Sequence, residues 1–235
     1  MQSLPIVLLK NREAFWTRME AQDLRWQELP SLVGFICLAC ALYGTVLAGW
    51  RSPLLVGYVA AKLPTLFLGT AGLVAAFNWM TAALWGSGLS FKSTVFVVFA
   101  AMAIGGWILL ALVPIALFFL FTGIGYAGSA TELRFAHNSI LMTHVLLLAC
   151  AGVLGNLALL HGLRRIVRPR CSVVGLFGTW LAAFALVGCQ LSWILRPFVG
   201  SPFFPVVFLR PDALDRNFYE FVFTEVLPFL LTGGT

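Results

Sequence analysis

Charged residues are scarce in this sequence of 235 residues: they make up 10% of it, while 60% of the residues are hydrophobic. An ordinary soluble domain carries roughly a quarter charged residues, so this chain has too few to coat one. The same shortage excludes a disordered chain, a disulfide-stapled secreted module and a nucleic-acid binder built on a basic face. The composition therefore predicts an integral membrane protein.

Long apolar runs make up most of the chain. A helix needs about 20 apolar residues to cross the hydrocarbon core of a bilayer. Five runs approach or exceed this length, at residues 32–48, 54–84, 94–121, 140–160 and 173–194. The second contains Pro64 and is longer than a bilayer requires, which predicts a kink or a short interfacial helix joined to the span. The expected fold is all-α, with a five-helix transmembrane bundle at residues 29–195.

The two ends of the chain flank this bundle. Charged residues run through the first part of the chain without an apolar core, so no cleavable signal peptide is expected. Residues 1–28 are expected to form a cytoplasmic segment with an amphipathic interfacial helix from Asn11 to Trp26, capped by Asn11. Residues 196–235 contain three proline-marked turns and an aromatic run, and they are expected to form an ordered extracytoplasmic segment.

The lysines and arginines predict the orientation, because their excess marks the cytoplasmic side of a membrane protein. Nine lie on one predicted side, four of them in the short loop between the fourth and fifth spans, and five lie on the other. The amino terminus is therefore expected in the cytoplasm and the carboxyl terminus outside, in the inner membrane of a bacterium.

Acidic residues are absent from the five predicted spans. Ionisable groups inside a membrane mark proton and ion pathways, so their absence argues against a carboxylate-based pathway and against an aspartyl or glutamate-zinc intramembrane protease. Lys62 is the charged exception. It is expected to extend its amine to the outer interface, and the alternative is a contact with an anion or a lipid headgroup.

Two histidines are candidates for a haem, pigment or metal ligand: His144, near the outer start of the fourth span, and His161, at its inner end. They are 17 residues apart, about 25 Å along a helix, so they cannot share one metal. A hydrogen bond to a neighbouring helix or headgroup is the expected role of each, and no metal or cofactor is predicted.

Other polar and small residues in the spans predict helix packing. The carboxamides Asn78, Asn156 and Gln190 are expected to hydrogen-bond between helices. Glycines at three-residue spacing predict close helix approach; they are Gly152 with Gly155, and Gly175 with Gly178.

Two motifs lack the context that their usual chemistry requires. Cys37 and Cys40 form a C-x-x-C in the middle of an apolar helix, without a second pair or a histidine at ligand spacing, so packing is their expected role. Residues 123–128 spell G-x-G-x-x-G but follow a membrane span, so a loop on the outer side is expected there and not a dinucleotide site.

Three short stretches resemble the bacterial branch of the Yip1-like integral membrane proteins. They are Leu9–Phe15 (LKNREAF), Ala61–Pro64 (AKLP) and Leu89–Lys92 (LSFK), within a resemblance that covers roughly residues 8–195. Residues 188–202 also look like a signature of uncharacterised bacterial membrane proteins. Eukaryotic Yip1 relatives are non-enzymatic trafficking partners of small GTPases, but their cytoplasmic partner-binding region is longer than the one present here. The resemblance implies a five-helix bundle without a known catalytic centre.

The expected function is that of a non-enzymatic accessory or scaffold subunit of a larger membrane assembly, with the bilayer and other membrane or periplasmic subunits as partners and no nucleic acid. Contacts with lipid or a partner are assigned to six residues: Trp16, Trp26, Lys62, Arg196, Arg210 and Arg216. One alternative is a small transporter or channel among spans two to four, near Lys62, Asn78 and Asn156. The other is a cofactor-bearing subunit that uses His144 or His161.

Overall fold

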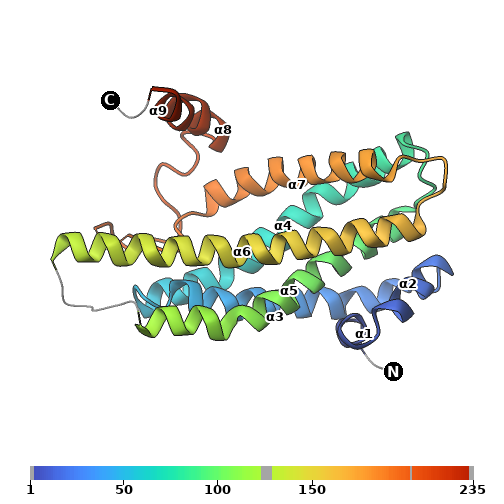
Figure 1. Cartoon of the computed structure of the whole chain (residues 1–235), viewed down its shortest axis with the longest axis horizontal. Helices are drawn as coiled ribbons and strands as arrows, with labels where there is room; N and C mark the ends of the chain where they lie inside the picture. The colour runs from blue at the N-terminus through green and yellow to red at the C-terminus, as the bar shows by residue number, and fades with distance from the viewer. Residues whose placement is uncertain (1–2, 123–128, 202, 233–235) are drawn as a thin grey trace.

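A computed structural model describes residues 3–122, 129–201 and 203–232, and all regular secondary structure within them is helical. Five long helices lie side by side, with α1 and α2 at one end of the bundle and α8 and α9 at the other (Figure 1). These are called the N-terminal and the C-terminal end below. The G-x-G-x-x-G motif at 123–128 lies outside the described residues.

Five helices in the described part of the chain are long and apolar enough to cross a membrane. They are α3 (Leu29–Ala48), α4 (Pro53–Leu84), α5 (Phe91–Thr122), α6 (Ala130–Ile166) and α7 (Val173–Leu195). The expected all-α fold and the number of apolar spanning helices are confirmed. Each helix contains the corresponding apolar run of the sequence.

Helix α6 begins well before its apolar run. Ser129 caps it by accepting a hydrogen bond from the Glu132 amide (3.4 Å), and the Glu132 carboxylate accepts one from the Ser129 amide (2.6 Å). This reciprocal pair fixes the start of a helix whatever the polarity of the next turns. At 37 residues, about 55 Å, α6 is longer than a bilayer core of about 30 Å.

Helix α4 is continuous through Pro64, so the expectation of a separate interfacial helix before the span is wrong. Proline removes one backbone donor, and apolar helices tolerate this loss where neighbouring groups support the backbone. Pro64 is buried against the rest of the bundle, as are Leu63 and Lys62 beside it. Packing around this turn therefore keeps the helix intact.

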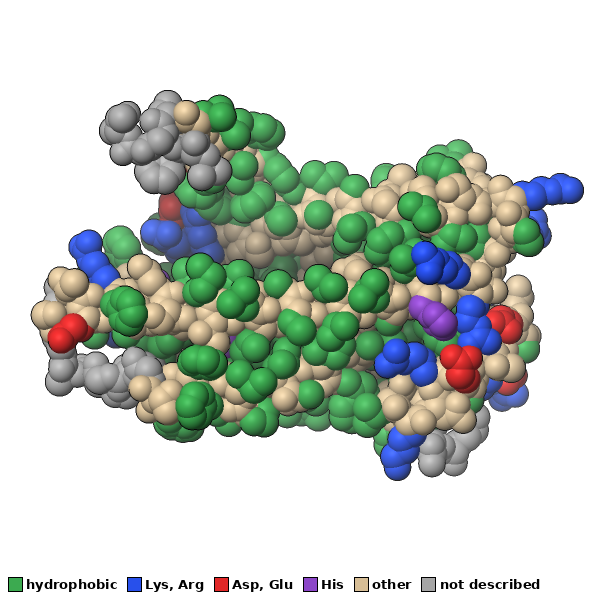
Figure 2. Space-filling view, viewed as in Figure 1, with side chains coloured by type: hydrophobic (Ala, Val, Ile, Leu, Met, Phe, Trp, Pro, Cys, Tyr) green, Lys and Arg blue, Asp and Glu red, His purple; other side chains and the backbone are tan. Residues whose placement is uncertain are grey.

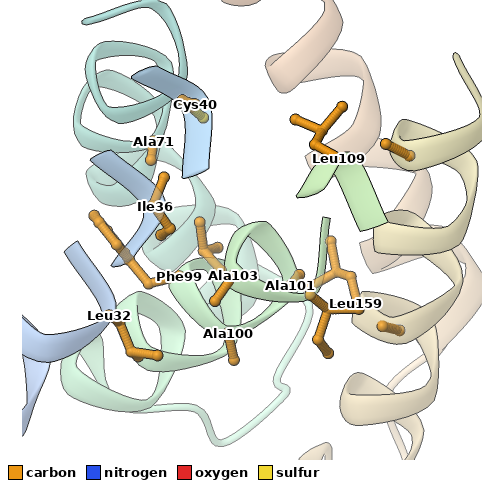
Figure 3. Close-up of a cluster of buried hydrophobic side chains, with 14 of the residues drawn as sticks. Leu32, Ile36, Cys40, Ala71, Phe99, Ala100, Ala101, Ala103, Leu109 and Leu159 are labelled. Atoms are coloured by element: carbon orange, nitrogen blue, oxygen red, sulfur yellow. The ribbon is translucent and has the colours of Figure 1, made fainter. Parts of the chain in front are cut away.

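Helix α5 lies at the centre of the bundle, with 67% of its most apolar stretch buried, whereas only 17% of that of α7 is buried. α3 packs on α4 and α5, α6 packs on α5, and α7 packs mainly on α4. Figure 3 shows Leu32 and Ile36 of α3 on the same side of α5 as Phe99, with Leu159 of α6 on the side of Ala101. The core is thus built on both faces of α5.

Glycine lets α3 and α4 approach closely. A Cβ atom placed on Gly44 would lie 2.8 Å from the Val59 carbonyl oxygen, which is closer than real Cβ atoms come to a backbone. Helix association in membranes depends on such close backbone approach. Gly44 therefore sets the distance between the first two spans.

At the N-terminal end, α1 (Leu4–Lys10) and α2 (Arg12–Glu20) fold against the bundle. The Asn11 side chain caps α2 by accepting a hydrogen bond from the Ala14 amide (3.1 Å). The second helix ends at Glu20 and does not continue to Trp26 as expected. Arg18 of α2 pairs with Glu28 (2.9 Å), the residue that precedes α3.

At the C-terminal end, the chain leaves α7 and runs without regular structure to a short helical segment beside the end of α7 (Figure 1). This segment consists of α8 (Phe218–Phe221), a π-helical turn (Val222–Val226) and α9 (Leu227–Thr232). The Tyr219 hydroxyl donates a hydrogen bond to the Leu186 carbonyl, and the Phe218 amide donates one to the Gln190 side chain (3.0 Å). These bonds hold the segment against α7.

Candidate functional site

The chain after α7 is fastened across the C-terminal end by side chains that donate to its backbone carbonyls. The Trp50 indole donates to the Val199 carbonyl (2.7 Å), and the Arg51 Nε atom donates to the Ser201 carbonyl (3.2 Å). Both donors come from the connection between α3 and α4. The segment is therefore part of the folded bundle and not a loose tail.

Lys62 makes a third bond of this kind. Its side chain is fully buried, its amine donates to the Pro197 carbonyl (3.1 Å), and the amine lies 5.1 Å from the centre of the Phe208 ring. The amine extends toward the C-terminal end of the bundle, and its contacts there are with the protein, which leaves no room for the alternative of a lipid-headgroup contact. A buried charge needs a partner, and here a carbonyl and an aromatic face supply one within the protein.

The three arginines assigned to partner contact are brought together at this end. They line one polar cavity of about 360 Å³ with three acidic and two aromatic residues: Arg196, Arg210, Arg216, Asp212, Asp215, Glu225, Trp193 and Phe221. The residues come from the end of α7, the connecting segment, α8 and the π-helical turn. Sequence reasoning named the arginines but not the acidic residues that line the cavity with them.

Ion pairs hold the walls of this polar cavity. Asp212 is shared, at 2.9 Å from the Arg196 Nη2 atom and 3.4 Å from the Arg210 Nε atom. Arg216 pairs with Glu225 at 2.7 Å. The Arg196 guanidinium also stacks on Trp193, 3.5 Å from the ring centre. Burial lowers the pKa of Arg196 and the nearby Asp212 opposes this shift, so the pair is coupled electrostatically.

A second cavity, of about 330 Å³, lies within the membrane-spanning part of the bundle. Its walls are almost wholly apolar and come from four helices; they include Leu63 and Phe67 of α4, Met102 of α5, Gly152 and Asn156 of α6, and Phe184 of α7. Gly152 is exposed, so the cavity opens to the surroundings beside it. Figure 2 shows the surface hollowed between α6 and α7.

Of the three carboxamides expected to hydrogen-bond between helices, Gln190 does so by accepting from the Phe218 amide of α8, and the other two do not among the described residues. The Asn156 amide donates to the Gly152 carbonyl of its own helix (2.8 Å). Asn78 is fully buried, and within the described residues its side chain has no hydrogen-bond partner. Of the three residues named for a transport pathway, Lys62, Asn78 and Asn156, only Asn156 lines the apolar cavity.

The two predicted histidines have separate environments. His144 is buried, and its Nδ1 atom is hydrogen-bonded to the Tyr43 hydroxyl (3.0 Å), which links α6 to α3. His161 is exposed at the N-terminal end and lies 4.0 Å from the Glu13 carboxylate. Among the described residues, no three His, Cys, Asp or Glu side chains gather as metal ligands would.

A third histidine, His137, was missed by the sequence reasoning. Its ring centre lies 5.4 Å from that of Trp50, and its Nδ1 atom is buried without a partner in the part of the chain described here. His137 and His144 are seven residues apart on α6, and Trp50 and Tyr43 have the same spacing at the end of α3 and beyond. The equal seven-residue spacing of the two histidines and of their two aromatic partners could have indicated these two pairs.

The two N-terminal tryptophans differ in exposure. Trp16 is fully buried, and any Cβ on Gly162 of α6 would collide with its indole. A contact of Trp16 with lipid or a partner was expected, but the side chain is enclosed by the protein. Its apolar ring packs into the protein because a glycine makes room there. Trp26 is half-exposed and lies against Phe91 and Phe96 of α5.

The glycine spacings predicted part of this geometry. A Cβ on Gly155 would lie 3.4 Å from the Ala101 carbonyl oxygen, so α5 and α6 approach closely there. Gly152, one turn earlier, has open space and borders the apolar cavity instead. Cys37 and Cys40 are free thiols, one exposed and one buried.

Comparison with protein-family models, curated proteins and solved structures found no match. The resemblance to Yip1-like proteins stays a prediction.

Proposed function

We propose that this protein is a non-enzymatic integral membrane protein that binds a lipid, with a lipid tail in the apolar cavity between α6 and α7. The observation that carries the proposal is the cavity of about 330 Å³ in the spanning part of the bundle. Its volume falls in the range of small-molecule sites, and its walls offer almost no hydrogen-bonding groups. An alkyl chain is the ligand class that fits such walls.

The depth of the apolar cavity supports a lipid tail. Phe184, which lines it, is the twelfth of the 23 residues of α7, and so lies at the middle of a helix about 35 Å long. The middle of a spanning helix lies where the lipid tails of the two leaflets meet. A ligand that reaches this depth from the side has to be apolar.

Substitution of Gly152 tests this proposal. A Cβ at Gly152 has open space, so Gly152→Phe is expected to fold and to place its ring in the cavity mouth. The full chain is purified in mild detergent, and the lipid that remains bound is measured by native mass spectrometry. Gly152→Phe is expected to lose most of this lipid.

Gly178→Phe is the matched control, because Gly178 is an exposed glycine of α7 with open space that does not line the apolar cavity. It is expected to retain lipid as the unaltered protein does. Equal retention by both variants, or no retained lipid in the unaltered protein, would overturn the proposal.

A second candidate is the accessory or scaffold subunit predicted from the sequence. It is favoured by the C-terminal helices, whose Phe223 and Leu231 side chains are exposed although both are large and apolar. Large exposed apolar side chains beside a spanning bundle can contact lipid or another membrane subunit. Truncation after Asn217 removes them while keeping the bonds of Trp50, Arg51 and Lys62. Loss of a co-purifying protein from native membranes supports this role, and unchanged co-purification rejects it.

The side of the membrane that each end faces remains a proposal based on the arginine count. If it is correct, the polar cavity faces the outside of a bacterial inner membrane. The ion pair of Arg165 with Glu20 (2.8 Å) then lies at the cytoplasmic side. A cysteine-accessibility assay at Arg210 and Arg25 separates the two orientations.

A further inference from the structure

The polar cavity lies at the depth of lipid headgroups. Helix α7 has 23 residues and is about 35 Å long, slightly more than the hydrocarbon core of about 30 Å. Arg168 and Arg170 precede it and Arg196 follows it. Because α7 is only just long enough to span, Arg196 and the polar cavity next to it are placed at the level of the lipid phosphates.

The polar cavity has three positive and three negative side chains, so its total charge is balanced. The ion pairs leave an excess positive charge on one part of the wall and an excess negative charge on another. Arg196 and Arg210 share the single carboxylate of Asp212, so this part of the wall has one positive charge in excess. Arg216 and Glu225 neutralise each other. Asp215 makes no ion pair with any described residue, so its part of the wall carries one negative charge in excess.

Two aromatic rings complete the polar cavity. The ring centres of Trp193 and Phe221 are 4.9 Å apart, and both side chains line the cavity. The stacking of Arg196 on Trp193 fixes the guanidinium, so less side-chain entropy is lost when it binds an anion. Aromatic faces also attract ammonium groups.

We propose that the polar cavity binds the headgroup of a phospholipid that carries an amine, with the phosphodiester at Arg196 and Arg210 and the ammonium at Asp215. This rests on the proposed function, since the same lipid places its tail in the apolar cavity. Arg196 and Phe184 are 12 residues apart on α7, about 18 Å, close to the half-thickness of the hydrocarbon core of about 15 Å. The distance along α7 between the two cavities therefore matches the length of one lipid tail.

The surface of the molecule agrees with this path. In Figure 2, lysine or arginine side chains and an acidic side chain lie at the end of the hollow between α6 and α7, beneath the C-terminal helices. The rest of the hollow has hydrophobic side chains along its edges. A polar end and an apolar length match the two parts of a phospholipid.

Other headgroups match the charges less well. A purely anionic headgroup leaves the Asp215 carboxylate near a negative phosphate without a compensating cation. A headgroup without phosphate leaves the excess charge of Arg196 and Arg210 without a partner. Such mismatched charges are a common source of selectivity against the wrong ligand.

The test measures which lipid the full chain retains. The protein is placed in bilayer nanodiscs with equal amounts of phosphatidylethanolamine and phosphatidylglycerol that have identical tails, extracted in mild detergent, and examined by native mass spectrometry. The unaltered protein is expected to retain several-fold more phosphatidylethanolamine. Arg210→Gln is expected to lower retention of both lipids by about tenfold, since it removes a charge-assisted contact to phosphate.

Asp215→Asn provides the sharper variant, because it breaks no ion pair with a described residue and is therefore expected to fold. It is expected to bring the ratio of the two lipids close to one without lowering total retention. Arg134→Gln is the control: Arg134 is also at the C-terminal end, but it lies over the Phe203 ring, 5.2 Å from its centre, outside the polar cavity. It is expected to leave both the amount and the ratio unchanged.

Three outcomes overturn the headgroup proposal. These are equal retention of the two lipids by the unaltered protein, an unchanged ratio in Asp215→Asn, and unchanged retention in folded Arg210→Gln. In each of them lipid is still retained, so the proposed function survives. Failure of the proposed function is distinct, because the unaltered protein then retains no lipid, or Gly152→Phe retains as much as it does.

Discussion

Helices α5 and α7 are both apolar enough to cross a membrane, but they are used differently. α5 is packed on two sides and buries 67% of its most apolar stretch, whereas α7 buries 17% of its own. α5 has α3, α4 and α6 as neighbours, whereas α7 packs mainly on α4. The buried residues of α5 include Ala100, Ala103, Gly105 and Gly106, which let neighbouring helices come close.

The contrast shows that entering the bilayer and being packed by other helices are two different properties of a helix. Apolar character decides whether a helix enters the bilayer, because lipid tails and leucine side chains are equally apolar. The position of the helix among its neighbours decides how much of it is then packed by protein, since Gly178 of α7 has open space although it is small. The exposed surfaces of α6 and α7 frame the apolar cavity, and the tightly packed α3, α4 and α5 support it.

The largest expected effect is at the crossing of α3 and α4. Gly44→Ala places a Cβ atom 2.8 Å from the Val59 carbonyl oxygen, so the two helices have to separate. The free energy of unfolding in detergent is expected to fall by about 1–3 kcal/mol, as measured by denaturant titration. Gly34→Ala is the control on the same helix, where the new Cβ has open space. Equal stability of the two variants would show that this crossing is not tight.

A smaller effect is expected at the contact between α3 and α6. Tyr43→Phe removes the hydroxyl that is bonded to His144 (3.0 Å) and leaves a buried histidine nitrogen unpaired. A loss of about 1 kcal/mol in the free energy of unfolding is expected, in line with hydrogen bonds between membrane helices. Tyr58→Phe is the control, because the Tyr58 ring packs edge-on against Phe208 and keeps that contact. No difference between these two variants would remove the Tyr43–His144 bond from the list of stabilising contacts.

The smallest effect has the opposite sign and lies on α7. Gly178→Ala adds a methyl group in open space and improves helix propensity, so the free energy of unfolding is expected to rise by about 0.5–1 kcal/mol. Gly175→Ala, one turn earlier, is expected to lower it, because the new Cβ would collide with the Trp85 ring. The same denaturant titration measures both. If Gly178→Ala is destabilising, α7 has a closer neighbour on this face than the bundle provides.

The sequence predicted the features that local patterns determine. The five apolar runs lie within the five spanning helices, and Asn11 caps α2 as expected. The start of α6 was placed too late, because hydropathy ends at the interface while the Ser129 and Glu132 cap does not depend on it. Of the two alternatives that Pro64 suggested, the separate interfacial helix is wrong, because α4 continues through the buried turn around Pro64, and the kink stays a prediction.

Features that depend on distant contacts could not be predicted. The partner of Lys62 is a backbone carbonyl 135 residues away, and no local pattern shows that the chain returns to it. The apolar cavity depends on how α6 and α7 are rotated about their own axes, which leaves Gly152 open and Gly155 packed. Arg196, Arg210 and Arg216 were assigned to lipid or partner contact one by one, but their shared cavity with Glu225 required the fold of the C-terminal segment.

The hydrogen bonds that hold the C-terminal segment have side-chain donors and backbone acceptors. Trp50, Arg51 and Lys62 donate from side chains, while the acceptors at Pro197, Val199 and Ser201 are backbone carbonyls. Every residue type has a backbone carbonyl, but few side chains can replace an indole, a guanidinium or an amine. In a saturation-mutagenesis library, the three donor positions should therefore tolerate few substitutions, while Ser201 should tolerate more; Val199 is restricted to apolar residues by its own burial in the core. The path of this segment is encoded mainly by residues that lie outside it.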